Sequence, residues 1–205
     1  MSAIFGARPA SQTVNRYTSV DVQTSSQGVA IPIVAGANRI GSNLIQFLNF
    51  QSTPAKGGGK GGKGGGKGAT AYDYSAAVAL GLCEGPVNVG TVWADSSVTT
   101  LGSLGLGLYS GTADQGPAAW IEANYPTQAL AYSQTAYLFS SNYSFGTSPS
   151  VPQHNVEVLG FLYGSVPESM DGADINMADW IPLYITSTQF GLDPDATYID
   201  PTSRS

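Results

Sequence analysis

The chain has a single histidine, His154, and a single cysteine, Cys83, and these are its clearest candidates for catalysis or metal binding. Glu157 stands three residues after His154, and histidine and glutamate are both zinc ligands. The alternation of Val156 and Val158 predicts a strand here, and residues three apart on a strand point to opposite faces. A histidine that is hydrogen-bonded or exposed is therefore favoured over a zinc ligand.

A nucleophilic pair of Cys83 and His154 is formally available, with Asn155 beside the histidine. The residues before Cys83 are the apolar sequence LGL, which favours a buried structural thiol over a reactive one. One cysteine also excludes an intrachain disulfide framework. No catalytic residue is predicted.

Four oxygen-bearing residues near the C-terminal part form the densest possible cation site: Asp171, Asp174, Asn176 and Asp179. Their spacing does not match the calcium loop D-x-[DN]-x-[DN]-G. A helix capped by Asp174, with acids near its positive N-terminus, accounts for the cluster without a metal. We therefore expect no metal and no cofactor.

The segment KGGGKGGKGGGKG, residues 56–68, meets the first seven positions of a phosphate-binding loop. The eighth position fails, because Gly68 replaces the hydroxyl residue that binds magnesium. Neither flank predicts the strand and helix that such a loop joins. The segment is predicted to be a flexible tether, whose ends would lie about 20 Å apart as a free chain. It carries every lysine of the protein: Lys56, Lys60, Lys63 and Lys67.

The chain of 205 residues is long enough for one domain, or two small ones, and only 11% of it is charged. Outside the lysine segment, four arginines face fourteen acids, so the remaining charge is 4 − 14 = −10. An acidic body argues against specific nucleic-acid binding. No run approaches 18 apolar residues, so we expect no transmembrane segment, and the start MSAIFGARPAS lacks the regions of a secretory signal. Low charge favours a subunit whose surface is covered by neighbours.

Most of the elements that must position these residues are predicted strands. Two apolar runs within GVAIPIVAGANRIGSNLIQFLNF are separated by AGANRIGSN, and Pro32 predicts an edge or the start of a strand. TAYDYSAAVALGLCE turns continuously apolar, as a strand buried on both faces would. A turn at Glu84-Gly85-Pro86 leads into VNVGTVWAD, so these two strands are expected to be antiparallel neighbours.

The rest of the chain is predicted to add strands and one helix. Residues 103–120 are turn-rich with no good helix, whereas ALAYSQTAYLFSSNYSF and HNVEVLGFLYG each predict a strand. The apolar spacing in DGADINMADWIPLYITSTQFG predicts a helix near residues 174–187, cut or kinked by Pro182. The fold class is mostly β, with α+β possible.

Several segments resemble the N-terminal part of the tail-tip attachment, or baseplate hub, proteins of long-tailed phages and gene transfer agents. The segments occur in the family's order over most of residues 20–193. They are DVQTSSQGVAIPIVAGANRIGSNLIQ, YDYSAAVALGLCEGPVNVGTVWAD, YPTQALAYSQTAYLFSSNY, HNVEVLGFLYG and ADWIPLYITSTQFGLD, with the Gly/Lys insertion after the first.

The resemblance implies one or two small β-barrels or β-sandwiches and a structural role without enzymatic activity. It implies a hub subunit, typically trimeric, that closes the tail tube and contacts the distal tail ring and fibre or receptor-binding proteins. Such a protein would reside at the tail tip of a virion assembled in the host cytoplasm. Family members usually run on for many hundreds of residues, so the chain is either the N-terminal piece of a longer protein or a shortened member.

In such a hub, Lys56, Lys60, Lys63 and Lys67 would contact a neighbouring subunit, the tube lumen or DNA. The expected division is an N-terminal β segment (1–55), the Gly/Lys loop (56–68), the rest of the β-rich domain (69–193) and a tail (194–205). Two other functions stay open. One is a secreted or surface β-sandwich that binds carbohydrate through Tyr and Trp side chains, and the other is a small cell-wall hydrolase.

Overall fold

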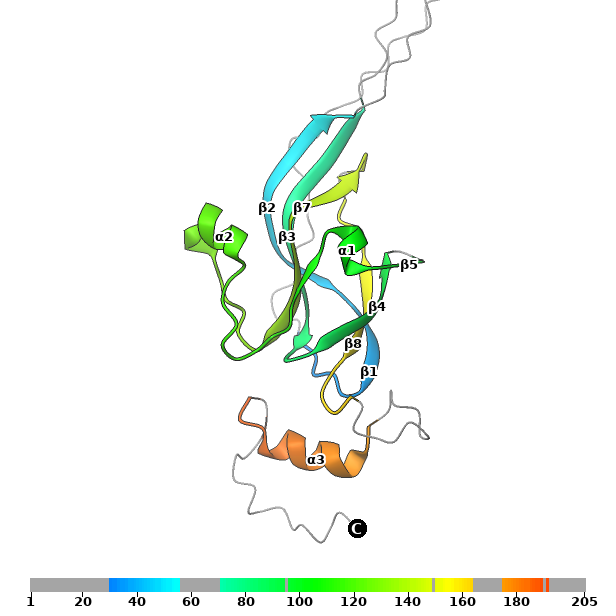
Figure 1. Cartoon of the computed structure of the whole chain (residues 1–205), viewed down its shortest axis with the longest axis vertical. Coiled ribbons are helices and arrows are strands. Elements are labelled where there is room, and N and C mark those ends of the chain that lie inside the picture. The colour runs from blue at the N-terminus through cyan, green and yellow to red at the C-terminus, as the bar shows by residue number, and fades with distance from the viewer. Residues whose placement is uncertain are drawn as a thin grey trace, which may run out of the picture.

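The computed structural model describes residues 30–55, 71–94, 96–148, 150–163, 175–189 and 191. Two antiparallel four-stranded sheets make up the body (Figure 1). The β1 sheet has the order β1 (Ala37–Gly41), β8 (His154–Leu159), β4 (Asn88–Ala94) and β5 (Ser97–Thr99). The β2 sheet has the order β2 (Asn43–Pro54), β3 (Tyr72–Glu84), β7 (Thr135–Gly146) and β6 (Gly107–Tyr109). The mostly β fold class is thus confirmed, and the sheets do not join into a closed barrel.

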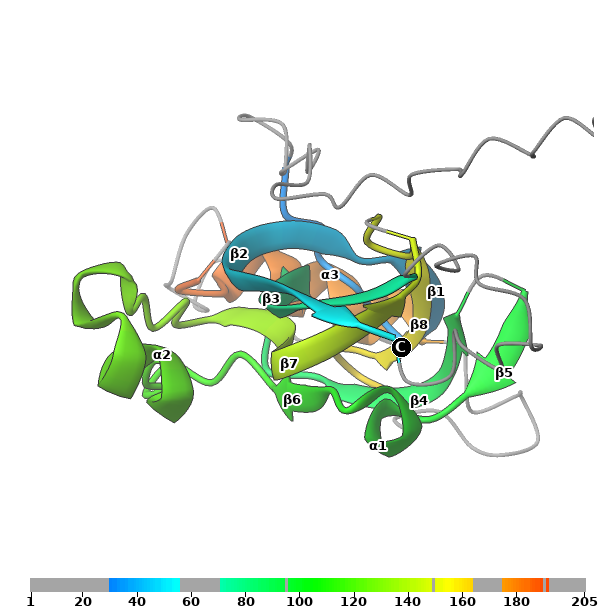
Figure 2. The ribbon, with the colours of Figure 1, turned by 90° about the horizontal axis from the view of Figure 1, so that it is seen from above.

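Two continuous stretches of chain connect the sheets. On one side, β1 passes into β2 through the single residue Ser42, so each sheet has its edge strand there. On the other side, β5 passes through the short helix α1 (Leu101–Leu104) into β6. Figure 2 looks along the long axis and shows β1 and β2 on one side of the body, and α1 and β6 on the other. We call the junction between β1 and β2 the seam.

The core lies between the two sheets. β3 contributes Val78 and Leu80, β7 contributes Leu138, and β8 contributes Val156 and Val158, all of them buried. The side chains of β8 alternate between buried and half-buried, as expected for a strand with one face on a core. Burying apolar area of this kind is the main favourable term in folding.

A third layer covers the outer face of the β2 sheet. It is built by residues 110–134, which include α2 (Ala119–Asn124) and the 3₁₀ turn Pro126–Gln128. Ile121 of α2 is 2% exposed, and the Trp120 ring lies 6.2 Å from that of Phe139 on β7. Both faces of β3 are therefore covered, which confirms the interpretation of its continuous apolar run.

Two expectations about strands are wrong. The first apolar run, with Pro32, forms no strand in its described part, residues 30–34, and β1 forms instead inside AGANRIGSN, after Gly36 turns the chain at φ 67°. β3 and β4 are not neighbours: the bend at Gly85 and Pro86 carries the chain from one sheet to the other. β3 pairs with β2 along one edge and with β7 along the other, so it has no free edge with which β4 could pair.

Smaller differences concern the ends of elements. α1 and α2 overlap the region expected to lack a helix; Thr100 caps α1, its side chain accepting a hydrogen bond from the Ser103 amide. β7 begins at Thr135, so residues 129–134 (ALAYSQ), which were expected to belong to this strand, lie outside it. The late helix is α3 (Met177–Thr186), and Pro182 lies inside it without ending it. The division into segments 1–55, 56–68, 69–193 and 194–205 stays a prediction.

Candidate interaction sites

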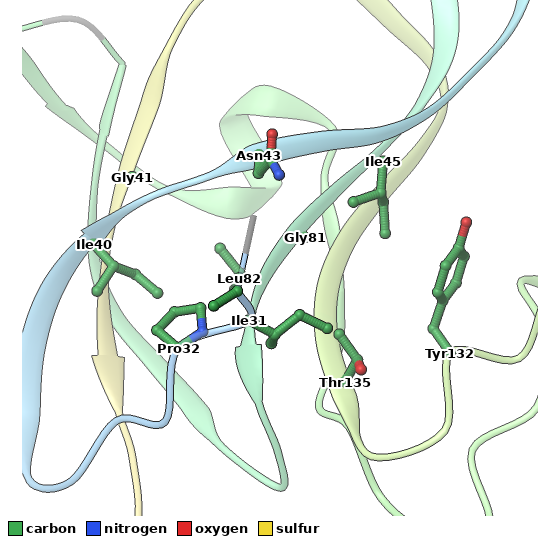
Figure 3. A pocket seen from close by; sticks show the side chains of 11 residues that line it. Ile31, Pro32, Ile40, Gly41, Asn43, Ile45, Gly81, Leu82, Tyr132 and Thr135 are labelled. Carbon is green, nitrogen blue, oxygen red and sulfur yellow. The ribbon is translucent and has the colours of Figure 1, made fainter. Parts of the chain in front are cut away.

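A groove opens at the seam, where the β1–β2 chain leaves β3 (Figure 3). Its volume is about 460 Å³, within the range of ligand pockets. The backbone of Ser42 donates a hydrogen bond of 2.9 Å to the His154 carbonyl, which continues the β1–β8 pairing by one residue at the seam. Before β1, the Pro32 carbonyl accepts a hydrogen bond of 2.9 Å from the Glu84 amide at the end of β3. The groove is the space left between these two attachments. Its lining residues are Ala30, Ile31, Pro32, Ile40, Gly41, Asn43, Ile45, Gly81, Leu82, Tyr132 and Thr135.

The walls of the seam groove are apolar. Ile31 is 49% exposed, and Ile45 lies so close to β3 that a Cβ on Gly81 would be 2.9 Å from its Cγ2. The polar groups are those of Asn43, Tyr132 and Thr135, and burial raises the pKa of Tyr132, which keeps its phenol neutral. No charged side chain is among the lining residues of the described chain. The groove is chemically suited to an apolar group, and an ion would find no counter-charge there.

α3 presents a second apolar surface. Met177, Ile181 and Tyr184 are 57%, 50% and 38% exposed, and their i, i+4, i+7 spacing places them along one stripe. We call this stripe the α3 apolar face. The helix is attached to the body through the Trp180 ring, 6.5 Å from that of Phe161.

A second attachment follows α3. The side-chain amide of Gln189 donates hydrogen bonds to the Glu84 carboxylate at 2.6 Å, the Gly85 carbonyl at 3.1 Å and the Gln134 carbonyl at 3.2 Å. The residues after α3 are thereby fixed to the turn that follows β3, and the α3 apolar face stays exposed.

The residues considered for catalysis are buried in separate places. Cys83 on β3 is fully buried, and burial, with a smaller contribution from Glu84, raises its pKa to about 12. His154 on β8 is 1% exposed, and its Nε2 lies 2.7 Å from the Tyr143 hydroxyl. The thiol is held in its neutral form, so Cys83 is a structural residue, as expected.

Glu157 also has a structural contact. It points away from His154 on β8, as expected, and its carboxylate accepts a hydrogen bond of 2.7 Å from the Thr91 amide. This bond lowers the pKa of Glu157. Thr91 lies in an irregular part of the β4–β8 pairing, between Val89 and Val92. The carboxylate thus satisfies a backbone donor at a β-bulge.

The expected acid cluster falls partly outside the described residues, which exclude Asp171 and Asp174. Asn176 caps α3 by accepting a hydrogen bond of 3.0 Å from the Ala178 amide, and Asp179 lies in the first turn. The residue that caps the described helix is therefore Asn176, where Asp174 was expected. No group of three or more metal-ligating side chains was found among the residues that the structure describes.

The four lysines, Lys56, Lys60, Lys63 and Lys67, lie outside the described residues. Their flanks are described: Ala55 donates a backbone hydrogen bond of 2.9 Å to the carbonyl of Ala71, next to the last β2–β3 pair. The Gly/Lys segment therefore connects adjacent strands, and the positions that anchor it are close together. Within the described part of the chain, no helix is long and apolar enough to cross a membrane.

Sequence reasoning missed the seam groove and the α3 apolar face. The apolar residues that line the groove are interleaved with core residues in the same strands, and no spacing in the sequence distinguishes the two sets. The exposed stripe of α3 could have been found from the i, i+4, i+7 spacing, but a stripe alone does not say whether it is covered.

No family model and no curated protein matches the chain. Among solved structures, the chain is similar to one in "Virion of native gene transfer agent (GTA) particle", with a TM-score of 0.49 and 27% sequence identity. The similarity covers 77% of this chain and 33% of that chain. This chain thus spans about a third of the length of the one it matches.

Proposed function

We propose that the chain is a non-enzymatic structural subunit of a phage-like tail tip. In this proposal it is a hub subunit that closes the tail tube and connects it to the distal tail ring and to fibre or receptor-binding proteins. It acts in the virion after assembly in the host cytoplasm, and it needs no cofactor.

The observation that carries the proposal is the order of the resembling segments. They fall on the framework of the fold, since they supply β1 and the start of β2, then β3 with β4, then most of β7, then β8, and last nearly all of α3. A resemblance confined to loops would carry little weight, whereas one that follows the framework concerns the body of the protein.

The surface chemistry supports a role in assembly. Charged residues make up 11% of the chain, less than half of the usual share. The α3 apolar face and the seam groove both expose apolar groups that a neighbouring chain could cover. These surfaces suit a homo-oligomer, for which we propose a trimer.

Light scattering coupled to size-exclusion chromatography tests the proposal. We expect the mass of a trimer, either for the purified chain or after addition of a distal tail-ring protein. A monomer that associates neither with itself nor with tail proteins, at low and at moderate salt, would refute it. Glycan binding by that monomer would then favour the carbohydrate-binding function.

We also propose that Lys56, Lys60, Lys63 and Lys67 contact a neighbouring subunit, the tube lumen or DNA. The support is their confinement to one glycine segment in a chain whose remaining charge is negative. Replacing all four with serine should reduce particle assembly or infectivity while the purified chain keeps its unfolding temperature. Full infectivity of the serine variant would show that these charges are dispensable, without bearing on the hub role itself.

A further inference from the structure

We propose that a pocket beside Tyr163 binds a neutral sugar. The pocket has a volume of about 320 Å³, at the lower end of the range of ligand pockets. It shares no lining residue with the seam groove. We call it the Tyr163 pocket, and its lining residues are Pro86, Val87, Asn88, Ser110, Leu159, Gly160 and Tyr163.

Backbone hydrogen bonds hold the strands of the Tyr163 pocket together. Asn88 at the start of β4 is opposite Leu159 at the end of β8. Next to this pair, the Val87 amide donates a hydrogen bond of 3.0 Å to the Ser110 carbonyl, which ties the chain after β6 to the chain before β4. The pocket is therefore formed before a ligand arrives, and a preformed site lowers the cost of binding.

Tyr163 lines the pocket and also faces solvent. The Gly160 amide donates a hydrogen bond of 2.9 Å to the Gly36 carbonyl, and the Tyr163 amide donates one of 3.2 Å to the Gly160 carbonyl. This turn after β8 fixes the backbone of Tyr163, whose side chain is 47% exposed. The face of a tyrosine ring is an apolar surface against which the C–H groups of a sugar ring can pack, and its hydroxyl is a polar group at one end.

Three side chains of the pocket carry groups that form hydrogen bonds: Asn88, Ser110 and Tyr163. Within the described part of the chain, none of these three groups is bonded to another protein group. An amide and a hydroxyl each supply both a donor and an acceptor. The hydroxyls of a sugar also donate and accept, so the polar groups of the pocket match those of a sugar.

The pocket has no charged side chain among the lining residues of the described chain. The acids nearest to it in the sequence, Glu84 and Glu157, are engaged by the Gln189 side chain and the Thr91 amide. A phosphate, carboxylate or ammonium group would therefore lose hydration without gaining a counter-charge. A single aromatic side chain lines the pocket, whereas proline-rich peptides dock in aromatic-lined grooves. These properties favour a neutral sugar over an ion or such a peptide.

Because one chain supplies every lining residue, sugar binding at this pocket does not depend on the hub role or on assembly.

An NMR titration of the full isotope-labelled chain tests the pocket. The neutral probes are methyl α-glucoside, methyl α-galactoside, methyl α-mannoside and N-acetylglucosamine, and the charged counterparts are glucuronic acid and glucosamine. At least one neutral probe should give saturable shifts at the amides of Asn88, Ser110 and Tyr163, with a Kd of about 1–10 mM for so small a ligand. Glucuronic acid and glucosamine should bind more weakly than methyl α-glucoside and N-acetylglucosamine, respectively.

Variants separate the ring from the polar groups. Tyr163→Ala removes ring and hydroxyl and should raise Kd about tenfold or more, whereas Tyr163→Phe keeps the ring and should raise it about two- to fivefold. Asn88→Asp keeps the size of the side chain but loses its donor, and should raise Kd about as much as Tyr163→Phe. Tyr184→Ala removes a 38% exposed ring from α3 and is the matched control, with an unchanged Kd.

Three results would overturn the proposal. The first is that none of the four neutral probes shifts the amides of the pocket at concentrations well above the expected Kd. The second is the same Kd for Tyr163→Ala and wild type; if Tyr163→Ala does not fold, an unchanged Kd of Asn88→Asp decides instead. The third is that the charged sugars bind as tightly as their neutral counterparts.

The outcome is independent of the test of the hub role. A monomer that binds a neutral sugar at these residues would refute the hub subunit and keep the Tyr163 pocket. A trimer that binds none of the probes would refute the pocket and keep the hub subunit.

Discussion

The thiol of Cys83 should be unreactive in the folded protein. Its pKa of about 12 lies roughly three units above the ordinary value, because burial disfavours the thiolate. At pH 8 the thiolate fraction is then about a thousandfold lower than in the unfolded chain. We expect alkylation by iodoacetamide to be slower by at least that factor without denaturant than in 6 M urea. Similar rates in both conditions would contradict the buried position.

The carboxylate of Glu157 should make stability depend on pH in the acid range. Its folded-state pKa is lowered by the Thr91 amide, so its contribution is complete above the unfolded-state value near 4.5 and is lost as the pH falls through the folded-state value. Glu157→Gln should lower Tm slightly at pH 7 and weaken the fall of Tm between pH 5 and pH 3. Glu122→Gln, at an exposed carboxyl of α2, should leave that fall unchanged.

Gly90 offers an independent test of the same contact. A Cβ added there would lie within contact distance of the Glu157 carboxylate, whose flexible end would have to move away from Thr91. Gly90→Ala and Glu157→Gln should therefore have similar effects, and the double variant should lose no more than either one. Additive losses would show that Glu157 does not act through the bulge.

At the scale of elements, the crossing between the third layer and the β2 sheet depends on Gly111. Its φ is +85°, and an added Cβ would lie 2.7 Å from the Ala136 amide nitrogen and 2.8 Å from the Gly85 Cα. Gly111→Ala should cost about 1–3 kcal/mol for the backbone conformation alone. Urea unfolding measures the loss, and Gly116→Ala, where a Cβ would meet nothing within 4 Å, should stay within about 0.5 kcal/mol of wild type.

The α3 apolar face should matter for association and not for folding. Ile181→Lys places a charge on a side chain that is 50% exposed, so the unfolding free energy should change by less than about 0.5 kcal/mol. If the face is an interface, light scattering should show a shift from oligomer to monomer. Val98→Lys adds the same charge to a 71% exposed apolar residue of β5 and is the matched control. Equal effects of the two variants would remove α3 from the interface.

The sequence predicts several of these elements and not the way they pair. The apolar run of β3, the turn at Glu84 and the helix at α3 follow from local patterns of side chains and turn residues. The placement of β3 and β4 in different sheets does not, because pairing is decided by contacts between distant strands. β1 was missed for the same reason: five residues with few apolar side chains become a strand through pairing with β8.

The candidate sites could likewise be predicted from the sequence only where they depend on local patterns. Cys83 could be predicted as a buried thiol from its apolar neighbours, whereas the contact of His154 with Tyr143 joins two sheets and has no local signature. The seam groove is defined by where a chain leaves a sheet, and that is a property of the assembled fold.

At the scale of the whole molecule, the Gly/Lys segment should be dispensable for folding. Ala55 and Ala71 already pair at the end of the β2–β3 ladder, so residues 56–70 can be replaced by Asn-Gly, which favours a tight hairpin turn. Shortening the loop from fifteen residues to two should stabilise the chain by roughly 1–2 kcal/mol through lower loop-closure entropy. Urea unfolding measures this change, and failure of the shortened chain to fold would show that the segment is needed for more than connection.

The direction of the strands has a mechanical consequence. The β2–β3 hairpin ends at one pole of the long axis, and α3 lies at the opposite pole (Figure 1). β2, β3 and β7 run along much of the distance between them, and the hydrogen bonds between antiparallel strands are perpendicular to the strands. A tensile load applied between the poles would therefore shear many of these bonds at once, whereas a sideways load on the hairpin would peel them one by one. The protein should resist stretching along its axis much better than bending across it.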